Sequence, residues 1–221
     1  MRDSQTAAGA WLALWNGFDP ARDAEYNDWH AREHVPERLT VPGMLRASRY
    51  QAIDDAVYPY FTLYEMASID VLASPEYQAL LRQPTDWTRR MRASFGALLR
   101  IPCQVMASAA GVRGTALMSL QIRGGDAAAL QAAMRTLAAA AGVVGVHSGR
   151  EDTAVAPLPW HGGAPTCAAH SSTHLLLVEA QSPDVLQALA GALPAQIVAL
   201  QPVLRLHRLL TLHHAQRPAS P

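Results

Sequence analysis

Short apolar runs alternate with longer polar segments along this chain, and their order in the first half predicts alternating strands and helices. An apolar run before Asp19-Pro20 is typical of a buried strand, and the polar segment after it has helical character until Pro42-Gly43 stops it. Two runs rich in aromatic and branched residues then predict adjacent strands, and proline breaks mark two further helices. The expected strands are residues 10–16, 44–52, 59–67 and 101–107, and the expected helices after Pro42 are residues 68–81 and 86–99. The first half therefore predicts the order βαββαβ.

The second half repeats this order with less polar helices. Its expected strands are residues 115–122, 142–151, 172–180 and 202–214, and its expected helices are residues 126–141 and 182–193. The repeat is also visible in single residues, because YEMASIDVL (64–72) aligns without gaps on VEAQSPDVL (178–186). We therefore expect two copies of one unit, over residues 1–109 and 110–215, followed by a disordered tail over residues 216–221.

A βαββαβ unit predicts the ferredoxin-like fold, in which an antiparallel four-stranded sheet carries both helices on one face. Two tandem units can bury their uncovered sheet faces against each other. The expected fold class is therefore α+β, with two ferredoxin-like units forming an intrachain pseudo-dimeric α/β barrel. In the last strand, Leu204, Leu206 and Leu210 share one face, while His207 and Thr211 share the other and are expected to line a cavity.

Composition limits the classes of partner. Hydrophobic residues make up 50% of the 221 residues, so the chain can bury a sizeable core, and Lys plus Arg (18) equals Asp plus Glu (18). This balance provides no field that would attract nucleic acid or an anionic membrane, and no apolar run is long enough for a membrane span. Neither partner is expected, while a further homodimer stays open. Two cysteines, Cys103 and Cys167, are too few for a disulfide framework and indicate a reducing, cytoplasmic location.

The first half resembles a known family in the residues around its polar helical segment. The run EYNDWHAREHVPERLTVPGMLRASRY (25–50), followed by YFTLYEMAS, ASPEYQAL and PTDWTRRMR, is similar to the EthD-like branch of the dimeric α/β-barrel superfamily. The resemblance covers roughly residues 10–107, and the second half shares only the element order. It implies a barrel with small-molecule pockets, in a superfamily that includes cofactor-free isomerases, polyketide cyclases, quinone-forming monooxygenases, lyases and haem-binding proteins. Such a resemblance implies fold far better than function.

His30, Glu33 and His34 spell the H-x-x-E-H pattern of inverted zinc proteases, and histidines four residues apart lie on one helical face. That chemistry needs an uninterrupted helix and a further carboxylate ligand, whereas Pro36 is expected to end or kink the helix near Val35. We therefore expect no metal site. The sequence has no phosphate-binding glycine loop, nucleophile elbow or CxxC pair either, so no cofactor is expected.

A helix end near Val35 would place His34 in the last turn, where unpaired carbonyls and the helix dipole favour a charged imidazole. His34 is then the candidate acid/base, with a neighbouring carboxylate such as Glu33 orienting a ring nitrogen and Arg38 holding a developing oxyanion. His30 is expected to be secondary, one turn earlier and nearer the surface. The structural alternative is that His34 caps the helix and Arg38 forms a surface ion pair.

Aromatic and basic residues are expected to form the wall of a pocket in the first unit, because only that unit carries the polar helical segment. The candidate substrate-binding residues are Tyr26, Trp29, Arg49, Tyr64, Trp87, His174 and His207. The expected ligand is a small hydrophobic or aromatic metabolite. Residues 156–172 predict a long loop, which is either a lid over the barrel mouth or a mobile connection.

Three hypotheses for the function remain open at this point. The leading one is a cofactor-independent enzyme that acts by proton transfer on a small apolar or aromatic carbonyl compound, as an isomerase, cyclase or lyase. The first alternative is a non-catalytic protein that binds a hydrophobic metabolite. The second alternative is a haem-binding or monooxygenase barrel, with a histidine such as His174 or His207 as the iron ligand.

Overall fold

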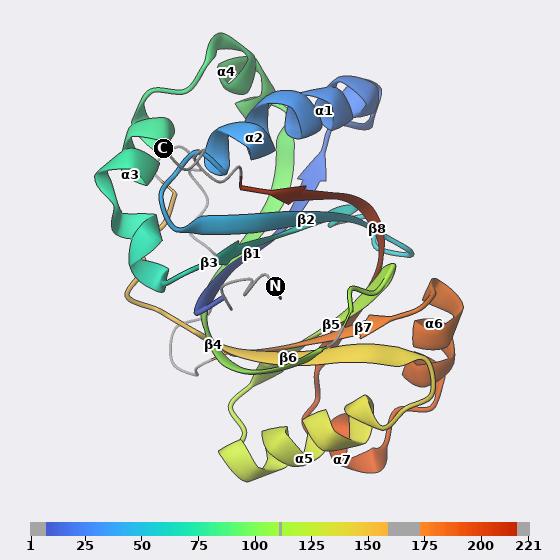
Figure 1. Ribbon diagram of the computed structural model, residues 1–221. Coiled ribbons are helices and arrows are strands. Elements are labelled where there is room, and N and C mark those ends of the chain that lie inside the picture. The colour runs from blue at the N-terminus through green and yellow to red at the C-terminus, as the bar shows by residue number, and fades with distance from the viewer. Residues whose placement is uncertain (1–7, 111, 159–172, 216–221) are drawn as a thin grey trace, which may run out of the picture.

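A computed structural model describes residues 8–110, 112–158 and 173–215 of the chain (Figure 1). The strands are β1 (Ala10–Phe18), β2 (Met44–Ala52), β3 (Tyr60–Met66), β4 (Phe95–Ala110), β5 (Ala116–Arg123), β6 (Val143–Glu151), β7 (Thr173–Ala180) and β8 (Val203–His214). The α-helices are α1 (Asp23–Trp29), α2 (Val35–Arg38), α3 (Pro75–Arg82), α4 (Asp86–Arg92), α5 (Ala127–Ala138), α6 (Pro183–Gly191) and α7 (Ala195–Val198). The tail over 216–221 and most of the loop predicted over 156–172 lie outside the described residues.

The strands form one closed antiparallel barrel in the order β1-β3-β2-β8-β5-β7-β6-β4. Each half of the chain supplies a four-stranded sheet in which its first strand lies between its third and its last, as in a ferredoxin-like unit. The two sheets join where β2 pairs with β8, from Arg46↔His214 onward, and where β4 pairs with β6, from Cys103↔Glu151 onward. The predicted fold, two tandem ferredoxin-like units in an intrachain α/β barrel, is confirmed.

The helices lie outside the barrel, at its two opposite sides. Figure 1 shows α1 to α4 of the first half on one side and α5 to α7 of the second half on the other, with the strands between them. Within the described ranges, no helix has the length and apolar character needed to cross a bilayer.

The barrel interior is filled with packed side chains, and the face of β8 that was expected to line a cavity is part of this packing. The buried residues of this interior cluster are Trp11, Ala13, Trp15, Tyr50, Phe61, Leu63, Ile101, Cys103, Leu117, Leu175 and Leu177. Trp15 is stacked on Phe61, with ring centroids 4.6 Å apart, and His207 is stacked on the same ring at 5.0 Å. His207 has no exposed surface and fills space rather than lining a cavity. Large aromatic rings close the interior of this small barrel.

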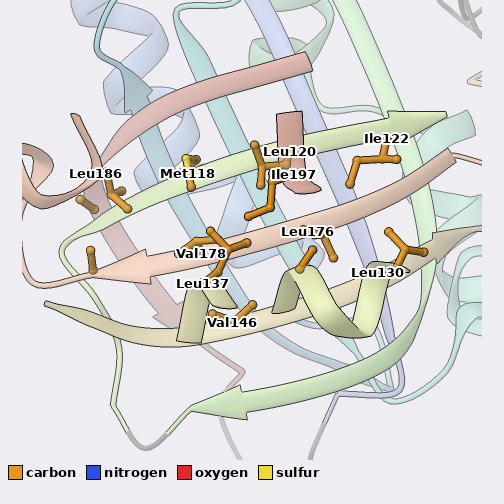
Figure 2. Packing of buried hydrophobic residues seen from close by; sticks show 13 residues of the cluster. Met118, Leu120, Ile122, Leu130, Leu137, Val146, Leu176, Val178, Leu186 and Ile197 are labelled. Atoms are coloured by element: carbon orange, nitrogen blue, oxygen red, sulfur yellow. The ribbon is translucent and has the colours of Figure 1, made fainter. Parts of the chain in front are cut away.

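The second unit packs its helices tightly on its sheet. Figure 2 shows Leu130 and Leu137 of α5, Leu186 of α6 and Ile197 of α7 meeting side chains of the strands. The strand side chains in this cluster include Met118, Leu120, Ile122, Val146, Leu176 and Val178 (Figure 2). The alanine-rich sequence of α5 permits this packing, because Ala133 presents only a methyl group to the core. The space between helices and sheet is therefore occupied in this unit.

An arginine from the connection between the halves joins two buried glutamates. Glu65 and Glu179 are equivalent positions of the internal repeat, and they are 5% and 2% exposed. Arg113 forms ion pairs with both of them, at 2.7 Å from Nη1 to Glu179 Oε1 and through Nη2 to Glu65. Arg46 adds a two-point contact to Glu65, at 2.8 Å for each nitrogen. Since each buried carboxylate has a guanidinium partner, neither leaves an uncompensated charge.

Two predicted elements differ from the structure. The helix expected over 86–99 ends at Arg92, and β4 begins at Phe95. Leu98 and Leu99 point to opposite faces of that strand, towards the helices and towards the barrel interior, so both contact apolar surroundings. The sequence also predicted that alternate residues of β8 stay on one face along the whole strand. A register shift between Arg49 and Tyr50 of β2 interrupts this alternation and places Thr211 opposite Arg49.

Truncation of Trp15 tests the closed interior. We expect Trp15→Ala to lower the free energy of unfolding by about 3–5 kcal/mol, because it leaves a cavity in a packed core. Val57→Ala shortens an apolar side chain that is 58% exposed, and it should change the free energy of unfolding by less than about 0.5 kcal/mol. Urea unfolding at neutral pH measures both values. A loss below about 1 kcal/mol for Trp15→Ala would contradict a filled barrel.

Candidate functional site

A cavity in the first unit lies between the outer face of its sheet and the helices that cover it. The empty space at this place is about 740 Å³ when the open solvent at its mouth is included. Its apolar wall consists of Leu12, Leu14, Trp29, Met44, Tyr77, Leu81, Phe95, Leu98 and Leu158, and its polar groups come from Asn16, Tyr26, His30, His34, Arg38, Thr62, Tyr64, Thr88, Arg92 and Arg100. These lining residues include three arginines and two histidines but no carboxylate. The wall therefore suits an apolar molecule that carries or develops negative charge.

The sequence predicted that the helical segment carrying the histidines ends near Val35. In the structure this segment continues to Arg38. After α1 comes a π-helical turn (His30–His34), which passes into α2. In this turn the Val35 N–H donates to the carbonyl of His30, five residues earlier. The wider turn admits Pro36, which has no N–H to donate, without ending the helix. His34 therefore has no helix end to stabilise a charged imidazole, and that part of the prediction is wrong.

The two histidines point to the same side of the helical segment, with ring centroids 5.3 Å apart. His30 is only 3% exposed, so the prediction that it lies nearer the surface is wrong. Its Nε2 is 3.3 Å from Thr62 Oγ1, and its Nδ1 is buried without a partner. The His34 ring lies 4.4 Å from the Trp29 ring, and its Nδ1 is also buried and unpaired. Neither ring nitrogen of His34 has a hydrogen-bond partner among the described residues, and Nδ1 is fully buried, so Nε2 is the nitrogen left for a ligand.

Both imidazoles are neutral at neutral pH. Burial lowers the pKa of His34 well below its usual value, and the charges of Arg38 and Arg49 lower it further. The pKa of His30 is lowered in the same way, by burial first and then by Arg49 and His34. A neutral imidazole can accept a proton, and nearby cations stabilise the anion that remains. The pair can therefore serve as a base rather than as the charged donor that the sequence suggested.

Arg38 forms an ion pair with Glu37, as the structural alternative proposed, but the pair is buried beside the cavity and not at the surface. It is 5% exposed, its Nη1 lies 3.0 Å from Glu37 Oε2, and its guanidinium lies 6.0 Å from the centre of the Tyr77 ring. Burial raises the pKa of Glu37, against the opposing effect of Arg38. The guanidinium of Arg38, paired with Glu37, therefore lies in a poorly hydrated place beside the cavity, where electrostatic interactions with a ligand are strong.

Two further arginines line the cavity and were missed by the sequence analysis. Arg100 of β4 donates from Nη1 to the carbonyl of Ala156 at 3.1 Å, and Arg92 at the end of α4 donates to the carbonyl of Leu81 at 3.1 Å. Burial lowers the pKa of Arg92, and the neighbouring Arg38 adds to this shift. No local motif marks either residue, because each reaches the cavity from an element distant in sequence.

Tyr26 and Tyr64, two of the candidate substrate-binding residues, lie in the polar part of the wall. The Tyr26 hydroxyl donates to Asn16 Oδ1 at 3.0 Å, and burial raises the pKa of Tyr26 to about 12. Tyr64 is 2% exposed, and its hydroxyl is buried without a hydrogen-bond partner. Burial raises the pKa of Tyr64 as well, so its hydroxyl stays protonated and can donate to a ligand oxygen.

Glu33 and Trp87 were predicted as site residues but hold the helices together outside the cavity wall. Glu33 Oε1 accepts hydrogen bonds from the hydroxyls of Thr85 and Thr88, at 2.5 and 3.2 Å, at the start of α4. Trp87 Nε1 donates to Glu25 Oε1 at 3.1 Å. Glu33 therefore fixes the helical segment against α4 and does not orient an imidazole.

His174, His207 and Arg49 also do not line this cavity. His207 lies in the barrel interior, where its Nε2 is 3.2 Å from Ser119 Oγ, and burial lowers its pKa to about 3. His174 lies on β7 opposite Ile122, in the second unit. Both were proposed as haem ligands, and neither faces a space that could hold a haem in the first unit. Arg49 lies immediately behind the wall, next to Tyr26.

The H-x-x-E-H pattern of His30, Glu33 and His34 does not bring its three side chains together. Across the described part of the chain, no group of three or more His, Cys, Asp or Glu side chains lies close enough to hold an ion. His30 and His34 stand together, but Glu33 turns away to the threonines of α4.

Comparison with known proteins shows similarity in fold only. No protein-family model matches the sequence, and no curated protein matches it either. An anthrone oxidase-like protein has a TM-score of 0.62 at 10% identity, covering 94% of this chain and 93% of its own. A candidate monooxygenase from Fusobacterium nucleatum has a TM-score of 0.58 at 9% identity, covering 94% and 95%. A haem-binding protein from Thermus thermophilus has a TM-score of 0.55 at 12% identity, covering 92% of each chain.

These similarities show the α/β-barrel fold that the sequence suggested. The EthD-like branch remains a prediction, since identities near 10% carry information on the fold alone.

The neutral histidine His30 makes stability depend on pH. Its pKa in the folded protein lies below the value of about 6.5 in the unfolded chain, so the unfolded chain takes up the proton first. Its contribution to stability is complete above pH 6.5 and is lost as pH falls below it. Urea unfolding measures the free energy of unfolding between pH 7.5 and 5. The slope of this free energy against pH should be smaller in His30→Gln, by up to about 1.4 kcal/mol per pH unit. The exposed His214→Gln should leave the slope as it is, and equal slopes in all three proteins would contradict a neutral His30.

Proposed function

We propose that this protein oxidises a small phenolic or enolisable aromatic compound with dioxygen, as a monooxygenase that needs no prosthetic group. The observation that carries this proposal is the cavity wall, in which neutral His34 has a free Nε2 beside three arginines and no carboxylate. Such a wall binds a planar apolar molecule and favours its conversion to an anion. The fold similarity to an anthrone oxidase-like protein and to a candidate monooxygenase supports oxidation over isomerase, cyclase or lyase chemistry.

In the proposed reaction, Nε2 of His34 takes a proton from the acidic CH₂ or hydroxyl group of the substrate. Arg38 and the unpaired Tyr64 hydroxyl stabilise the anion. The anion transfers electrons to dioxygen, and a C–O bond forms at the activated carbon. The imidazolium gives its proton to the peroxide, which becomes a hydroperoxide. The imidazole then takes the second proton of that carbon, the C–H electrons form the C=O bond, and the O–O bond breaks. The leaving hydroxide takes this proton from the imidazolium and becomes water. A CH₂ group and O₂ thereby give a C=O group and water, in which four electrons pass from the carbon to oxygen.

A desolvated cavity suits this chemistry for two reasons. Burial strengthens the attraction between the arginines and the substrate anion, because the local dielectric is low. An anionic ligand near Nε2 also raises the affinity of His34 for a proton, since it opposes the effect of the surrounding cations. This effect offsets the low proton affinity of the imidazole as the substrate anion forms.

Haem binding is the second candidate, and His34 is the residue that favours it. The neutral His34 ring has the free nitrogen that an iron ligand needs, and Arg92 and Arg100 are placed on the same wall for carboxylate groups. A bound haem would supply redox chemistry at its iron. The earlier candidates His174 and His207 do not fit this role, since they lie away from the cavity.

Anthrone is a suitable probe for the oxidase. Purified protein in air should form anthraquinone and consume one O₂ for each product, followed by absorbance and an oxygen electrode. His34→Gln should lower kcat by about 100-fold or more with a small change in KM, because it removes the base but keeps a similar volume. His214→Gln, a surface change, is the matched control and should have normal kcat.

Three results would decide against this proposal. Undiminished turnover in His34→Gln would show that His34 is not the base. Tight binding of aromatic compounds without any turnover would favour a binding protein that is not an enzyme. A Soret band in the purified or haem-treated protein that is lost in His34→Gln would replace the cofactor-free reaction with the haem candidate.

A further inference from the structure

Arg49 of β2 is a buried cation whose charge no described carboxylate balances. It is 2% exposed, and its guanidinium lies 4.7 Å from the centre of the Tyr26 ring and 4.4 Å from that of Tyr60. Its Nη1 donates to Asn27 Oδ1 at 2.7 Å. The nearby Asp23 accepts hydrogen bonds from Asn27 and Tyr60 instead. The aromatic rings and one amide are therefore its partners.

Two nitrogens of Arg49, Nε and Nη2, are buried without any acceptor. Nε and Nη2 lie side by side on one edge of the guanidinium, and such an edge can donate to both oxygens of one carboxylate. Arg46, on the same strand, shows this edge occupied, since its Nε and Nη2 each lie 2.8 Å from an oxygen of Glu65. In Arg49 the same edge is empty. A buried charged donor without an acceptor is unfavourable, so these two nitrogens favour a ligand that brings an acceptor to them.

Arg49 lies directly behind the cavity wall. Arg49 stands on the Tyr26 ring and is the β-sheet partner of Thr62, and both of these residues line the cavity. His30 is the third neighbour, and its Nδ1 has no hydrogen bond to hold the ring in place. On the other side, Thr211 of β8 lies opposite Arg49 and has a buried hydroxyl without a partner. The second unit thus contributes a polar group to this place.

We propose that the Nε–Nη2 edge of Arg49 binds the carboxylate of an aromatic acid, which enters from the cavity past the His30 ring and also meets the Thr211 hydroxyl. This inference rests on the proposed function for the cavity as the binding place, and it makes the substrate an aromatic carboxylic acid rather than a neutral arene. It also explains why the site needs both units, because β8 supplies Thr211 and closes the barrel beside β2.

Binding of 2-naphthoate and 2-naphthamide tests this inference, since the two compounds share their shape and differ in charge. Titration calorimetry at pH 7.5 without oxygen should show that the wild-type protein binds the carboxylate at least about tenfold tighter, a difference of 1.4 kcal/mol. Arg49→Gln should abolish this preference and leave naphthamide binding unchanged. Arg49→Lys should also lose most of it, because lysine has the charge but no two-point edge. Arg208→Gln removes an exposed arginine of the adjoining strand and should behave as the wild type.

Equal wild-type affinity for the two compounds would overturn the inference without any variant. A full preference in Arg49→Gln or Arg49→Lys would overturn it as well, and Thr211→Val, which keeps the side-chain shape, should weaken naphthoate alone. If Arg49→Gln does not fold, two other measurements decide on the inference. They are the ratio of wild-type affinities for naphthoate and naphthamide, and the naphthoate affinity of Thr211→Val. These measurements need no turnover, so a protein that prefers naphthoate but oxidises nothing would uphold this inference and contradict the oxidase.

Discussion

The burial of two sheet faces against each other is the constraint on which the rest of this structure depends. Each ferredoxin-like sheet has one face covered by helices, and the other is covered only because β2 pairs with β8 and β4 pairs with β6. Trp11, Trp15 and Phe61 fill the enclosed space, together with aliphatic residues of both units. Because the interior is filled, a ligand has to bind on the outer, helix-covered faces.

The two outer faces differ because their helices carry side chains of different size. In the second unit, Ala133 and small aliphatic groups let the helices pack closely on the sheet. In the first unit, Tyr26 and Trp29 stand between the helical segment and the sheet, and the space between such large rings is not completely filled. The π-helical turn brings His30 and His34 into this space. Arginines from α2, α4 and β4 then give the cavity its positive character.

Element order and the internal repeat could be predicted from the sequence, since alternation with period two and the proline and glycine breaks are local signals. The faces of the strands could not be assigned, because alternation shows that Trp11 and Leu12 point to opposite sides but not which side is enclosed. His207 was for this reason expected at a cavity and lies in the packed interior. Pro36 was expected to end the helix, and the π-helical turn that accommodates it has no sequence signal. Arg92 and Arg100 were missed because they reach the cavity through tertiary packing.

The central claim is that ligands bind between the helices and the sheet of the first unit, and not within the barrel. A crystal structure of the protein soaked with a heavy-atom-labelled arene such as 4-bromophenol tests this most directly, because anomalous scattering locates the bromine itself. The account predicts one strong bromine peak between His34, Tyr64 and Leu98. A peak inside the barrel near Phe61 and His207, or between α5 and the sheet of the second unit, would contradict it.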